Sequence, residues 1–505
     1  MRPRSCPVRP LSGLAAMLGA PSGGPRAPLA AVTGVTIDSR QVQRGDLYVA
    51  LPGSTAHGAA FSAAAVAAGA VAILTDPTGR EAAVATGVPV LVVPDPRSVL
   101  GRVAAWVYGQ PSSGLLLLGV TGTSGKSTTT FLLEAGLRAA GHSTGLIGGV
   151  EIHVGATTFP PTLTTPEATD LQGLLALMRE DGVTAAAMEV SSHALALGRV
   201  DGASYDVALF TNLSQDHLDF HRDLEDYFLT KARLFTPELC RAGVVNIDDE
   251  HGRELVGIAK VPVTTFSAAG AAEADWRAQD VRLGSDGSTF RVIGPGGVEA
   301  DVSVALPGPF NVANTLGALV TLVEAGVPLQ TAVNGVGTVT GVPGRMERVP
   351  GADGFQAIVD YSHKPGAVES VLRALREVTS GSLIVVLGCG GDRDRGKRPM
   401  MGEAAARLAD VAVLTSDNPR SEDPLRIISA MFEGVLRVPR RERAHVIVEP
   451  DRAAAIGLAV GRAGPGDVVV VAGKGHEQGQ YVDDEVLPFD DRQVVAEAIR
   501  RRDRM

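Results

Sequence analysis

The chain has 505 residues, of which 45% are hydrophobic and 20% are charged, and its formal net charge is -10. This composition predicts a globular protein of about three domains, and the acidic balance argues against a surface that as a whole binds nucleic acid or anionic membranes. The 3 cysteines predict neither a disulfide framework nor a zinc site, and no run of about 18 apolar residues predicts a membrane span, so we expect a cytoplasmic protein.

The first 110 residues predict a small N-terminal α/β domain. Its expected elements are two strands split by a polar turn, an alanine-rich helix and two short strands, at 32–51, 59–70, 71–74 and 88–93. The segment YGQPSSG at 108–114 has the composition of a linker.

Residues 111–340 predict a central domain with a doubly wound, mostly parallel sheet. Apolar runs typical of buried strands alternate with helical segments, and they lie at 115–120, 184–190, 206–213 and 242–248. From 264 to 306 the pattern changes to alternating strands with glycine turns, which predicts an antiparallel flank of the same domain.

Residues 341–505 predict a third domain that is again α/β and Rossmann-like. GVPGRMERV at 341–349 is the expected hinge into it. Its predicted strands lie at 355–361, 382–388, 411–416 and 467–473.

The strongest motif is GVTGTSGKSTTT at 119–130. A strand ends there, glycines let the backbone turn, and a helix begins, so backbone N–H groups can cradle a phosphate. Lys126 would reach the β- and γ-phosphates, and the Ser127 hydroxyl would bind Mg²⁺. The spacing departs from the usual one at Val120, and no Asn-Lys-x-Asp motif supports a GTPase. The residues of this phosphate loop are Gly122, Thr123, Ser124, Gly125, Lys126 and Ser127.

Acidic and imidazole side chains follow two predicted strand ends. Glu189 stands at the end of one strand, and Asp216 and His217 come just past another. Ligands of open α/β sheets bind at this edge, and a carboxylate with an imidazole beside a phosphate loop is a reasonable Mg²⁺ site. The alternative is that His217, like His193 and His221, is an ordinary polar cap.

Lysine is scarce in this chain, because six of the 46 basic residues are lysine and the others are arginine. Five of the six lie in motif-like stretches, namely Lys126, Lys231, Lys364, Lys397 and Lys474. A compact ammonium or a neutral amine does chemistry that a guanidinium cannot, so this placement favours functional lysines over chance. Lys231 interrupts a predicted amphipathic helix at 226–235, and it is either a surface lysine or an amine that is chemically modified near the metal.

The loop TSDNPRSEDP at 415–424 carries one arginine directly after a proline. Pro419 stiffens the bend, and Asn418 can donate or accept a hydrogen bond beside it. A guanidinium grips a carboxylate in two places, so Arg420 is a candidate ligand of a substrate carboxylate. The alternative is a surface salt bridge.

Together these motifs resemble the Mur ligase family, ATP-dependent enzymes that join an amino acid to a UDP-muramoyl-peptide in bacterial cell-wall synthesis. The resemblance covers nearly the whole chain and rests on TGTSGKSTTT, EVSSHAL, NLSQDHLDFH, YFLTKARLF, GPFNVANTLGAL, PGRMERV, VDYSHKPGAVESVL, GCGGDRDRGKRP, SDNPR and AGKGHE. It implies ATP and Mg²⁺ as cofactors, UDP-MurNAc-L-Ala-D-Glu and diaminopimelate as substrates, and an acyl-phosphate intermediate. We expect a monomer.

The resemblance also implies roles for individual residues. Lys126, Lys231 and His217 would be catalytic, and Lys231 would be carbamylated to N6-carboxylysine. The implied metal ligands are Ser127, Glu189, His217 and Lys231. The implied nucleotide ligands beyond the phosphate loop are Asn314, Arg345, Asp360 and His363.

Substrate positions follow from the resemblance in the same way. The UDP-muramoyl-peptide would meet Ser39, Thr164, Thr165, Ser191 and Arg199. Diaminopimelate would meet Arg393, Asp417, Asn418, Pro419, Arg420, Gly473 and Glu477. In the family, DNPR in this position goes with diaminopimelate, whose distal carboxylate needs a cation.

Two segments depart from the family pattern. The family often has His-Thr-Pro where this chain has His363-Lys364-Pro365, and the segment around His57 lacks the usual Asp-Gly order. Three alternatives stay open: a sister ligase that adds L-lysine or another residue, a folylpolyglutamate synthetase with the same chemistry, and a non-enzymatic nucleotide-binding regulator.

Overall fold

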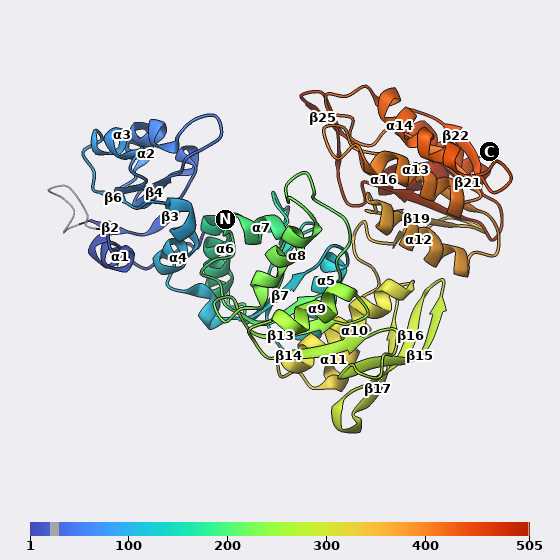
Figure 1. The fold of residues 1–505 in the computed structure, drawn as a ribbon, viewed down its shortest axis with the longest axis horizontal. Coiled ribbons are helices and arrows are strands. Elements are labelled where there is room, and N and C mark those ends of the chain that lie inside the picture. Colours follow the sequence, from blue (N-terminus) through green and yellow to red (C-terminus); the bar gives the residue numbers. More distant parts are fainter. Residues whose placement is uncertain (21–29, 503, 505) are drawn as a thin grey trace.

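The computed structural model describes residues 1–20, 30–502 and 504. Three sheet-based units follow one another along the chain, and the central one lies between the other two (Figure 1). Each sheet is flanked by helices, so the predicted three-domain α/β class is confirmed. The domain boundaries at 110/111 and 340/341 stay predictions. No helix within the described residues is long and apolar enough to cross a membrane.

The N-terminal unit is a four-stranded parallel sheet with helices around it. In spatial order its strands are β3 (Gly34–Thr36), β4 (Asp46–Ala50), β5 (Ala72–Thr75) and β6 (Val90–Val92). Its helices are α1 (Leu11–Leu18), α2 (Ser62–Ala68), α3 (Arg80–Val84) and α4 (Pro96–Val107), and a short ribbon pairs β1 (Arg9–Pro10) with β2 (Ala31–Val32). The sequence patterns did not predict α4, although Asp95 caps it by accepting from the Arg97 N–H and Pro96 occupies its first turn.

The predicted linker at 108–114 joins the N-terminal and central units, and it has a folded conformation. Pro111–Gly114 forms a 3₁₀ turn, η4, in which Pro111 and Ser112 are buried. Both η4 and α4 pack against α6 (Ala168–Glu180) of the central unit. The connection is therefore part of the interface that seats the N-terminal unit on the central one.

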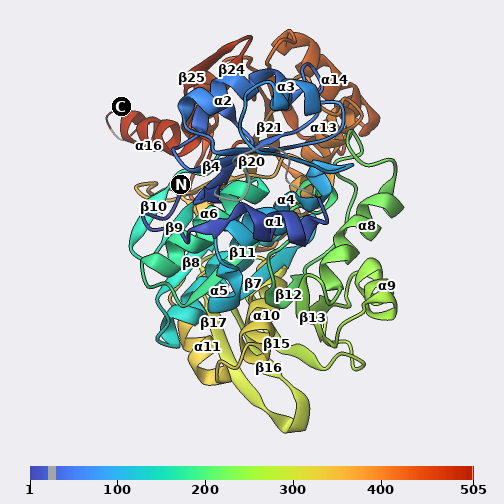
Figure 2. The same cartoon turned by 90° about the vertical axis from the view of Figure 1, so that its left-hand side faces the viewer.

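The central unit is an eleven-stranded sheet. In spatial order its strands are β10 (Thr157–Phe159), β9 (Ile152–Val154), β8 (Thr144–Ile147), β11 (Ala185–Glu189), β7 (Leu116–Thr121), β12 (Tyr205–Phe210), β13 (Cys240–Asn246), β14 (Val263–Ser267), β15 (Trp276–Gly284), β16 (Gly287–Ile293) and β17 (Glu299–Val304). Neighbours from β8 to β15 are parallel, and both edges are antiparallel. The antiparallel flank predicted at 264–306 is confirmed for β15–β17, which projects away from the other units (Figure 2). It is wrong for β14, which pairs parallel with β13 and β15.

Helices cover both faces of the central sheet. One core contains side chains of α5 (Lys126–Ala139), α10 (Pro309–Glu324) and α11 (Leu329–Val336). The other contains side chains of α6, α7 (Ser192–Ala196), α8 (Leu224–Ala232) and α9 (Glu250–Ile258). This double winding brings the carboxyl ends of β7, β11 and β12 to one edge, where ligands of such sheets bind.

The C-terminal unit is a second doubly wound sheet. In spatial order its strands are β18 (Glu347–Arg348), β19 (Gln356–Asp360), β23 (Val468–Ala472), β20 (Leu383–Leu387), β21 (Val411–Leu414) and β22 (His445–Val448). Its helices are α12 (Pro365–Val378), α13 (Lys397–Leu408) and α14 (Pro424–Arg437) on one face and α15 (Arg452–Arg462) and α16 (Asp491–Arg502) on the other. A hairpin of β24 (Gly479–Val482) and β25 (Glu485–Pro488) follows β23.

Candidate active site

The phosphate loop joins β7 to α5 and turns on two glycines. Gly122 and Gly125 have φ of 144° and 90°, which other residues rarely adopt. A Cβ on Gly125 would stand 2.3 Å from Asn314 Oδ1, so only glycine lets α10 approach the loop. Lys126 Nζ folds back and donates to the carbonyls of Gly122 at 2.8 Å and Thr123 at 3.1 Å. Burial, with the nearby Lys364 ammonium, lowers the pKa of Lys126 to about 8.

Glu189 and Ser127 meet at the mouth of this loop. Ser127 Oγ donates to Glu189 Oε1 at 2.9 Å, and the Gly149 N–H donates to the same oxygen at 2.9 Å. Arg345 Nη2, from the C-terminal unit, donates to Ser127 Oγ at 3.1 Å. A hydroxyl and a carboxylate oxygen therefore converge where the sequence predicted metal ligands.

His217 lines the same cavity with a backbone at positive φ. Its φ is 54°, and its Nε2 lies 2.9 Å from Asp216 Oδ2, within hydrogen-bond distance. Its ring centroid lies 4.7 Å from that of His193, which packs on it edge-on. A non-glycine residue held at positive φ is typical of functional sites, and this favours a ligand over the polar-cap alternative.

The residues present fit a magnesium ion. The part of the chain that the structure describes has no cluster of three His, Cys, Asp or Glu side chains able to hold a metal. Mg²⁺ does not need one, because it keeps several waters and uses one or two carboxylates together with substrate phosphates. The converging oxygens of Ser127 and Glu189 match that requirement.

Lys231 is buried, so the surface-lysine alternative is wrong. Its residue is 1% exposed, because α8 packs its apolar face onto the sheet beneath the phosphate loop. Its Nζ donates to Gly122 O at 3.0 Å and lies 4.4 Å from the centroid of the Tyr227 ring. Burial, with Lys126 and Lys364 nearby, holds the pKa of Lys231 well below its ordinary value. The amine is thereby favoured in the neutral form that carbamylation requires.

The C-terminal unit supplies the other wall of the cavity. Asp360 accepts from the N–H groups of Met346 and Ser362, both at 2.8 Å, so its carboxylate orders the segment that carries Arg345. The Arg345 guanidinium lies 4.2 Å from the centroid of the Tyr361 ring. His363 Nδ1 donates to Tyr361 O at 2.8 Å, and burial, followed by the field of Lys364, holds its pKa well below the ordinary range. His363 is therefore neutral.

One cavity of about 520 Å³ is lined by most of these groups, although not by Lys231. Its lining comes from the central and C-terminal units and includes the apolar side chains of Phe266, Leu306 and Phe310. The predicted site residues that line it are Thr123, Ser124, Gly125, Lys126, Ser127, Thr164, Glu189, Ser191, His217, Asn314, Arg345, Asp360 and His363. Asn314 Nδ2 donates to Asn311 Oδ1 at 3.1 Å, and both asparagines line the cavity together with these apolar side chains.

The other predicted positions for the muramoyl-peptide are only partly brought together. Thr165 Oγ1 donates to Glu189 O at 2.9 Å and accepts from the Ser191 N–H at 3.1 Å, so it braces the cavity wall. Arg199 forms an ion pair with Glu167 at 2.8 Å. Ser39 lies in the N-terminal unit, in the 3₁₀ turn Ser39–Gln41.

The predicted diaminopimelate residues form a second cluster at the carboxyl ends of β21 and β23. Asn418 Nδ2 donates to Glu477 Oε2 at 2.9 Å. The buried Lys474 donates from Nζ to Asn418 Oδ1 at 2.7 Å and to Gly479 O at 2.6 Å. Gly473 has a φ of 119°, and a Cβ there would stand 2.5 Å from Asp417 Oδ2. That buried oxygen has no hydrogen-bond partner among the described residues.

Arg420 is held by its backbone rather than by an ion pair. Its φ is 51°, its N–H donates to Tyr481 O at 3.0 Å, and its carbonyl accepts from the Asp483 N–H at 2.8 Å. Its Nη1 donates to Gly391 O at 2.7 Å. No acidic residue in the described chain forms a salt bridge with this guanidinium, so the surface-salt-bridge alternative is not supported. Arg393 is exposed and donates to Asp392 O at 3.2 Å.

Two residues that support this cluster were not predicted as site residues. The scarcity of lysine marked Lys474 as unusual, but the sequence did not indicate its partners. No sequence pattern marked Arg452, which is fully buried in an ion pair with Asp491 at 2.7 Å. Its guanidinium also donates to Ser416 O at 3.3 Å and Ala472 O at 3.1 Å. It thereby ties together the ends of the two strands that present the second cluster.

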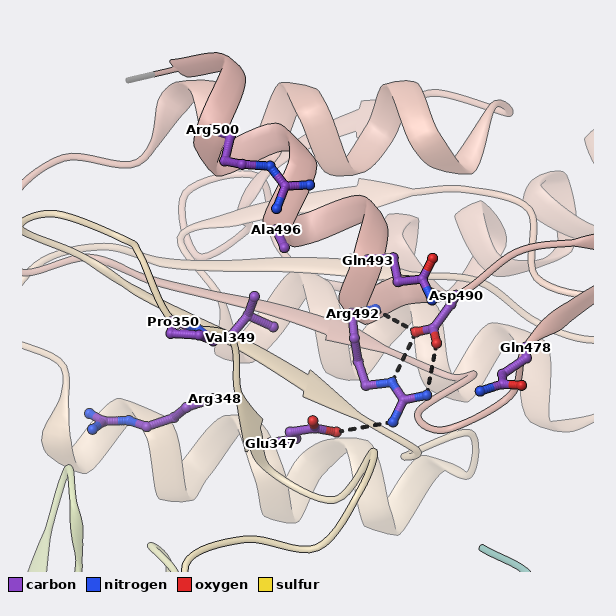
Figure 3. A pocket seen from close by; sticks show the side chains of 10 residues that line it. All are labelled: Glu347, Arg348, Val349, Pro350, Gln478, Asp490, Arg492, Gln493, Ala496 and Arg500. Atoms are coloured by element: carbon purple, nitrogen blue, oxygen red, sulfur yellow. Dashed lines mark hydrogen bonds and ion pairs between the residues drawn. The ribbon is translucent and has the colours of Figure 1, made fainter. Parts of the chain in front are cut away.

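A further cavity, of about 470 Å³, lies between β18 and α16. Figure 3 shows Arg492 turned toward Asp490 and Glu347, and its Nη2 donates to Asp490 Oδ2 at 2.8 Å. None of its lining residues was predicted as a site residue. Its lining residues are all different from those of the cavity that contains the phosphate loop, so it is separate from the site described above.

Comparisons with known proteins agree with the sequence resemblance. Models described as "Mur ligase family, catalytic domain", "Mur ligase middle domain" and "Mur ligase, glutamate ligase domain" match residues 31–108, 120–322 and 344–475. The UDP-N-acetylmuramoyl-L-alanyl-D-glutamate–2,6-diaminopimelate ligase of Streptomyces avermitilis is 59% identical over 99% of this chain and 98% of its own length. The chain belongs to the Mur ligase family.

Other relatives place the chain within this family. The protein of the same name from Corynebacterium glutamicum is 46% identical over 94% of this chain and 92% of its own length. A solved structure of such a ligase superposes with a TM-score of 0.67 at 35% identity, covering 94% of this chain and 96% of the other. E. coli FolC in complex with DHPP and ADP has a TM-score of 0.58 at 18% identity, which shows a shared fold alone.

Proposed function

We propose that this protein is the ATP-dependent ligase that adds 2,6-diaminopimelate to the D-Glu γ-carboxylate of UDP-MurNAc-L-Ala-D-Glu, a step of peptidoglycan precursor synthesis. One observation supports the reaction class: Lys126, Glu189 and Arg345 line the same cavity between two units. The acceptor and the amino acid follow from the names of relatives that are 45–59% identical. A non-enzymatic nucleotide-binding regulator is disfavoured because these close relatives are named as ligases.

The reaction has two steps, and the cavity must stabilise the negative charge of the reacting groups in both. In the first, the bond from the γ-phosphorus to the ADP oxygen breaks, and a bond to a γ-carboxylate oxygen forms, giving an acyl-phosphate. In the second, the amine nitrogen of diaminopimelate attacks the acyl carbon, inorganic phosphate leaves and the ammonium loses a proton. Overall, ATP, a carboxylate and an ammonium become ADP, phosphate, an amide and a proton.

The chain's own residues stabilise and orient the reactants. Lys126 and Arg345 place positive charge beside the phosphoryl group that is transferred, in a site largely shielded from water. Asn314 and the apolar side chains that line the cavity would orient the adenine, and Asp360 fixes the segment that carries Arg345. Because both units supply groups, their approach sets the geometry of the reacting atoms.

Mg²⁺ would be held by Ser127, Glu189, His217 and a carbamylated Lys231. When bound, the ion supplies Lewis-acid stabilisation of phosphate charge. Carbamylation turns a buried amine into an anionic oxygen ligand, and the low pKa of Lys231 supports this assignment. We also infer a monomer, in the cytoplasm where ATP is supplied.

Diaminopimelate would bind at the second cluster. Its distal carboxylate would meet the Arg420 guanidinium, of which Nη1 alone is hydrogen-bonded to a described residue, and its distal ammonium would meet Glu477. L-Lysine lacks the distal carboxylate, so an arginine here favours diaminopimelate over a lysine-adding ligase.

The experiment is a phosphate-release assay with ATP, Mg²⁺, UDP-MurNAc-L-Ala-D-Glu and single amino acids: the LL and meso forms of diaminopimelate, L-lysine and L-glutamate. We expect phosphate release and tripeptide product with diaminopimelate and at least tenfold less with L-lysine. Dihydropteroate with L-glutamate tests the folylpolyglutamate alternative. No turnover with any muramoyl acceptor would overturn the proposed function.

A further inference from the structure

Lys364 reaches from the C-terminal unit into the phosphate site of the central unit. Its Nζ forms an ion pair with Asp216 Oδ2 at 2.5 Å and donates to Thr123 O at 3.4 Å. Its backbone is fixed, because Lys397 Nζ donates to His363 O at 2.9 Å and Pro365 begins α12. The Lys364 side chain, 14% exposed, lines the cavity that holds the phosphate loop.

Three lysines thereby converge on two carbonyl groups. Lys126 and Lys231 both donate to Gly122 O, and Lys126 and Lys364 both donate to Thr123 O. Each of these amines comes from a different segment of the chain. Lys231 is favoured as a neutral amine, whereas the ammonium groups of Lys126 and Lys364 repel each other. Among the described residues, Asp216 is the one carboxylate that forms a salt bridge with any of the three lysines. Such an arrangement is stabilised by an anion that carries several charges.

We propose that Lys364 is a further catalytic residue, which binds the γ-phosphoryl group of ATP through its ammonium and accompanies that group during transfer. This inference rests on the proposed function for its reaction and on the geometry for its site. Lys231 lies under the loop, whereas Lys364 faces the cavity, so the ammonium moves from the Asp216 carboxylate to a phosphate oxygen by a side-chain rotation. Asp216 then pairs with His217 alone.

The role is electrostatic and needs no proton transfer. As the bond to the ADP oxygen breaks and the bond to the γ-carboxylate oxygen forms, the outer oxygens of the phosphoryl group keep their negative charge. Lys364 donates a charge-assisted hydrogen bond to one of them throughout. Because Lys364 belongs to the C-terminal unit, its contact also makes the arrangement of the two units depend on the presence of a γ-phosphate. Threonine at this position would offer a short neutral hydroxyl.

The test compares the binding of ATP and ADP to Lys364→Met by titration calorimetry with Mg²⁺ present. We expect ATP to bind about 10- to 100-fold more weakly, the range for one lost charge-assisted hydrogen bond. ADP, which lacks the γ-phosphoryl group, should change by less than about twofold on the same reasoning. Lys364→Arg should recover most of the preference for ATP. Lys260→Met, which removes an exposed lysine of the same unit as the phosphate loop, is the matched control.

Each outcome bears on the inference. A loss confined to ATP supports it, and a second neutral variant, Lys364→Gln, gives the same test if Lys364→Met does not fold. Equal weakening of ATP and ADP would show a latch between the units instead, and unchanged binding of both would show a surface role; either overturns the inference. If the wild-type chain binds ATP but forms no tripeptide, the proposed function fails while the ATP and ADP comparison still decides the place of Lys364.

Discussion

The nucleotide site and the amino-acid site are built in different ways. The first joins segments that lie far apart in the chain, as the hydrogen bond from Arg345 to Ser127 across 218 positions shows. The second is made within the C-terminal unit, where Asn418, Lys474 and Glu477 bind one another. Movement between units should therefore change nucleotide binding strongly and leave recognition of the amino acid nearly intact.

The two sites also differ in what lies beneath them. Under the amino-acid site, Arg452 and Asp491 form an ion pair that is 0% exposed and that fixes the ends of β21 and β23. Under the phosphate loop lies Lys231, an amine with a lowered pKa. The first support consists of protein groups alone, whereas we propose that the second is completed by carbamylation of Lys231 and a bound ion. We therefore expect substitutions at the nucleotide site to lower activity more than substitutions at the amino-acid site.

The largest effect should come from Lys126→Met. Removing the cation that faces the transferred phosphoryl group should lower kcat about 1,000-fold, the range for loss of one preorganised stabilising group. Phosphate release under saturating substrates measures it, with Lys260→Met as the control. Turnover within tenfold of wild type would show that Lys126 does not stabilise the transferred charge.

Lys231→Ala should lower activity about 100-fold, the upper range for loss of a group that supports a bound ion. Added bicarbonate should not restore activity, because the amine that would form the carbamate is gone. In the wild-type protein, ¹³C-labelled bicarbonate should give a carbamate carbon signal that Lys231→Ala lacks. Near-normal activity, or the same signal in both proteins, would contradict the assignment.

Arg420→Ala should act on the amino acid alone. Loss of a charge-assisted contact predicts a KM for diaminopimelate about 20-fold higher, with the KM for ATP unchanged. Arg426→Ala, which removes an exposed arginine at the start of α14, is the matched control. Equal rises in the KM for diaminopimelate and the KM for ATP would contradict the prediction that Arg420 contributes only to the amino-acid site.

The smallest effect should come from Arg452→Lys. The buried charge stays beside Asp491, but the hydrogen bonds to Ser416 O and Ala472 O are lost, each worth about 1 kcal/mol. We expect a KM for diaminopimelate about fivefold higher with kcat and the KM for ATP unchanged. If the KM stays at the wild-type value while the melting temperature falls, Arg452 serves stability and not the position of the two loops.

Local sequence signals predicted the phosphate loop and the strand ends well. Gly122, Gly125, Lys126 and Ser127 lie within one turn of backbone, so their geometry follows from φ preferences and from the start of a helix. The antiparallel flank of the central sheet was equally visible, because alternation and glycine turns are local patterns. Helix α4 was missed even though Asp95 and Pro96 mark its start, because its apolar residues were not recognised as one face.

Contacts between segments that are distant in the sequence could not be predicted from local patterns. The family resemblance implied that Arg345 belongs with the nucleotide, but its bond to Ser127 exists only because two sheets face each other. Arg452 looked like any arginine at a helix start, and its burial depends on where Asp491 arrives from the end of the chain. The periodicity of a single segment contains no information about such partners.

The chain by itself determined that this is a three-domain α/β ligase of the Mur family with a phosphate loop at Lys126, because those features are encoded in short contiguous motifs. It also marked five lysines as exceptional. Only the tertiary structure decided what those lysines meet: Lys231 is buried rather than exposed, and Lys364 reaches from one unit to Asp216 in another. The physical reason is that burial and charge pairing depend on how sheets pack together, whereas backbone turns and strand ends depend on neighbours in sequence.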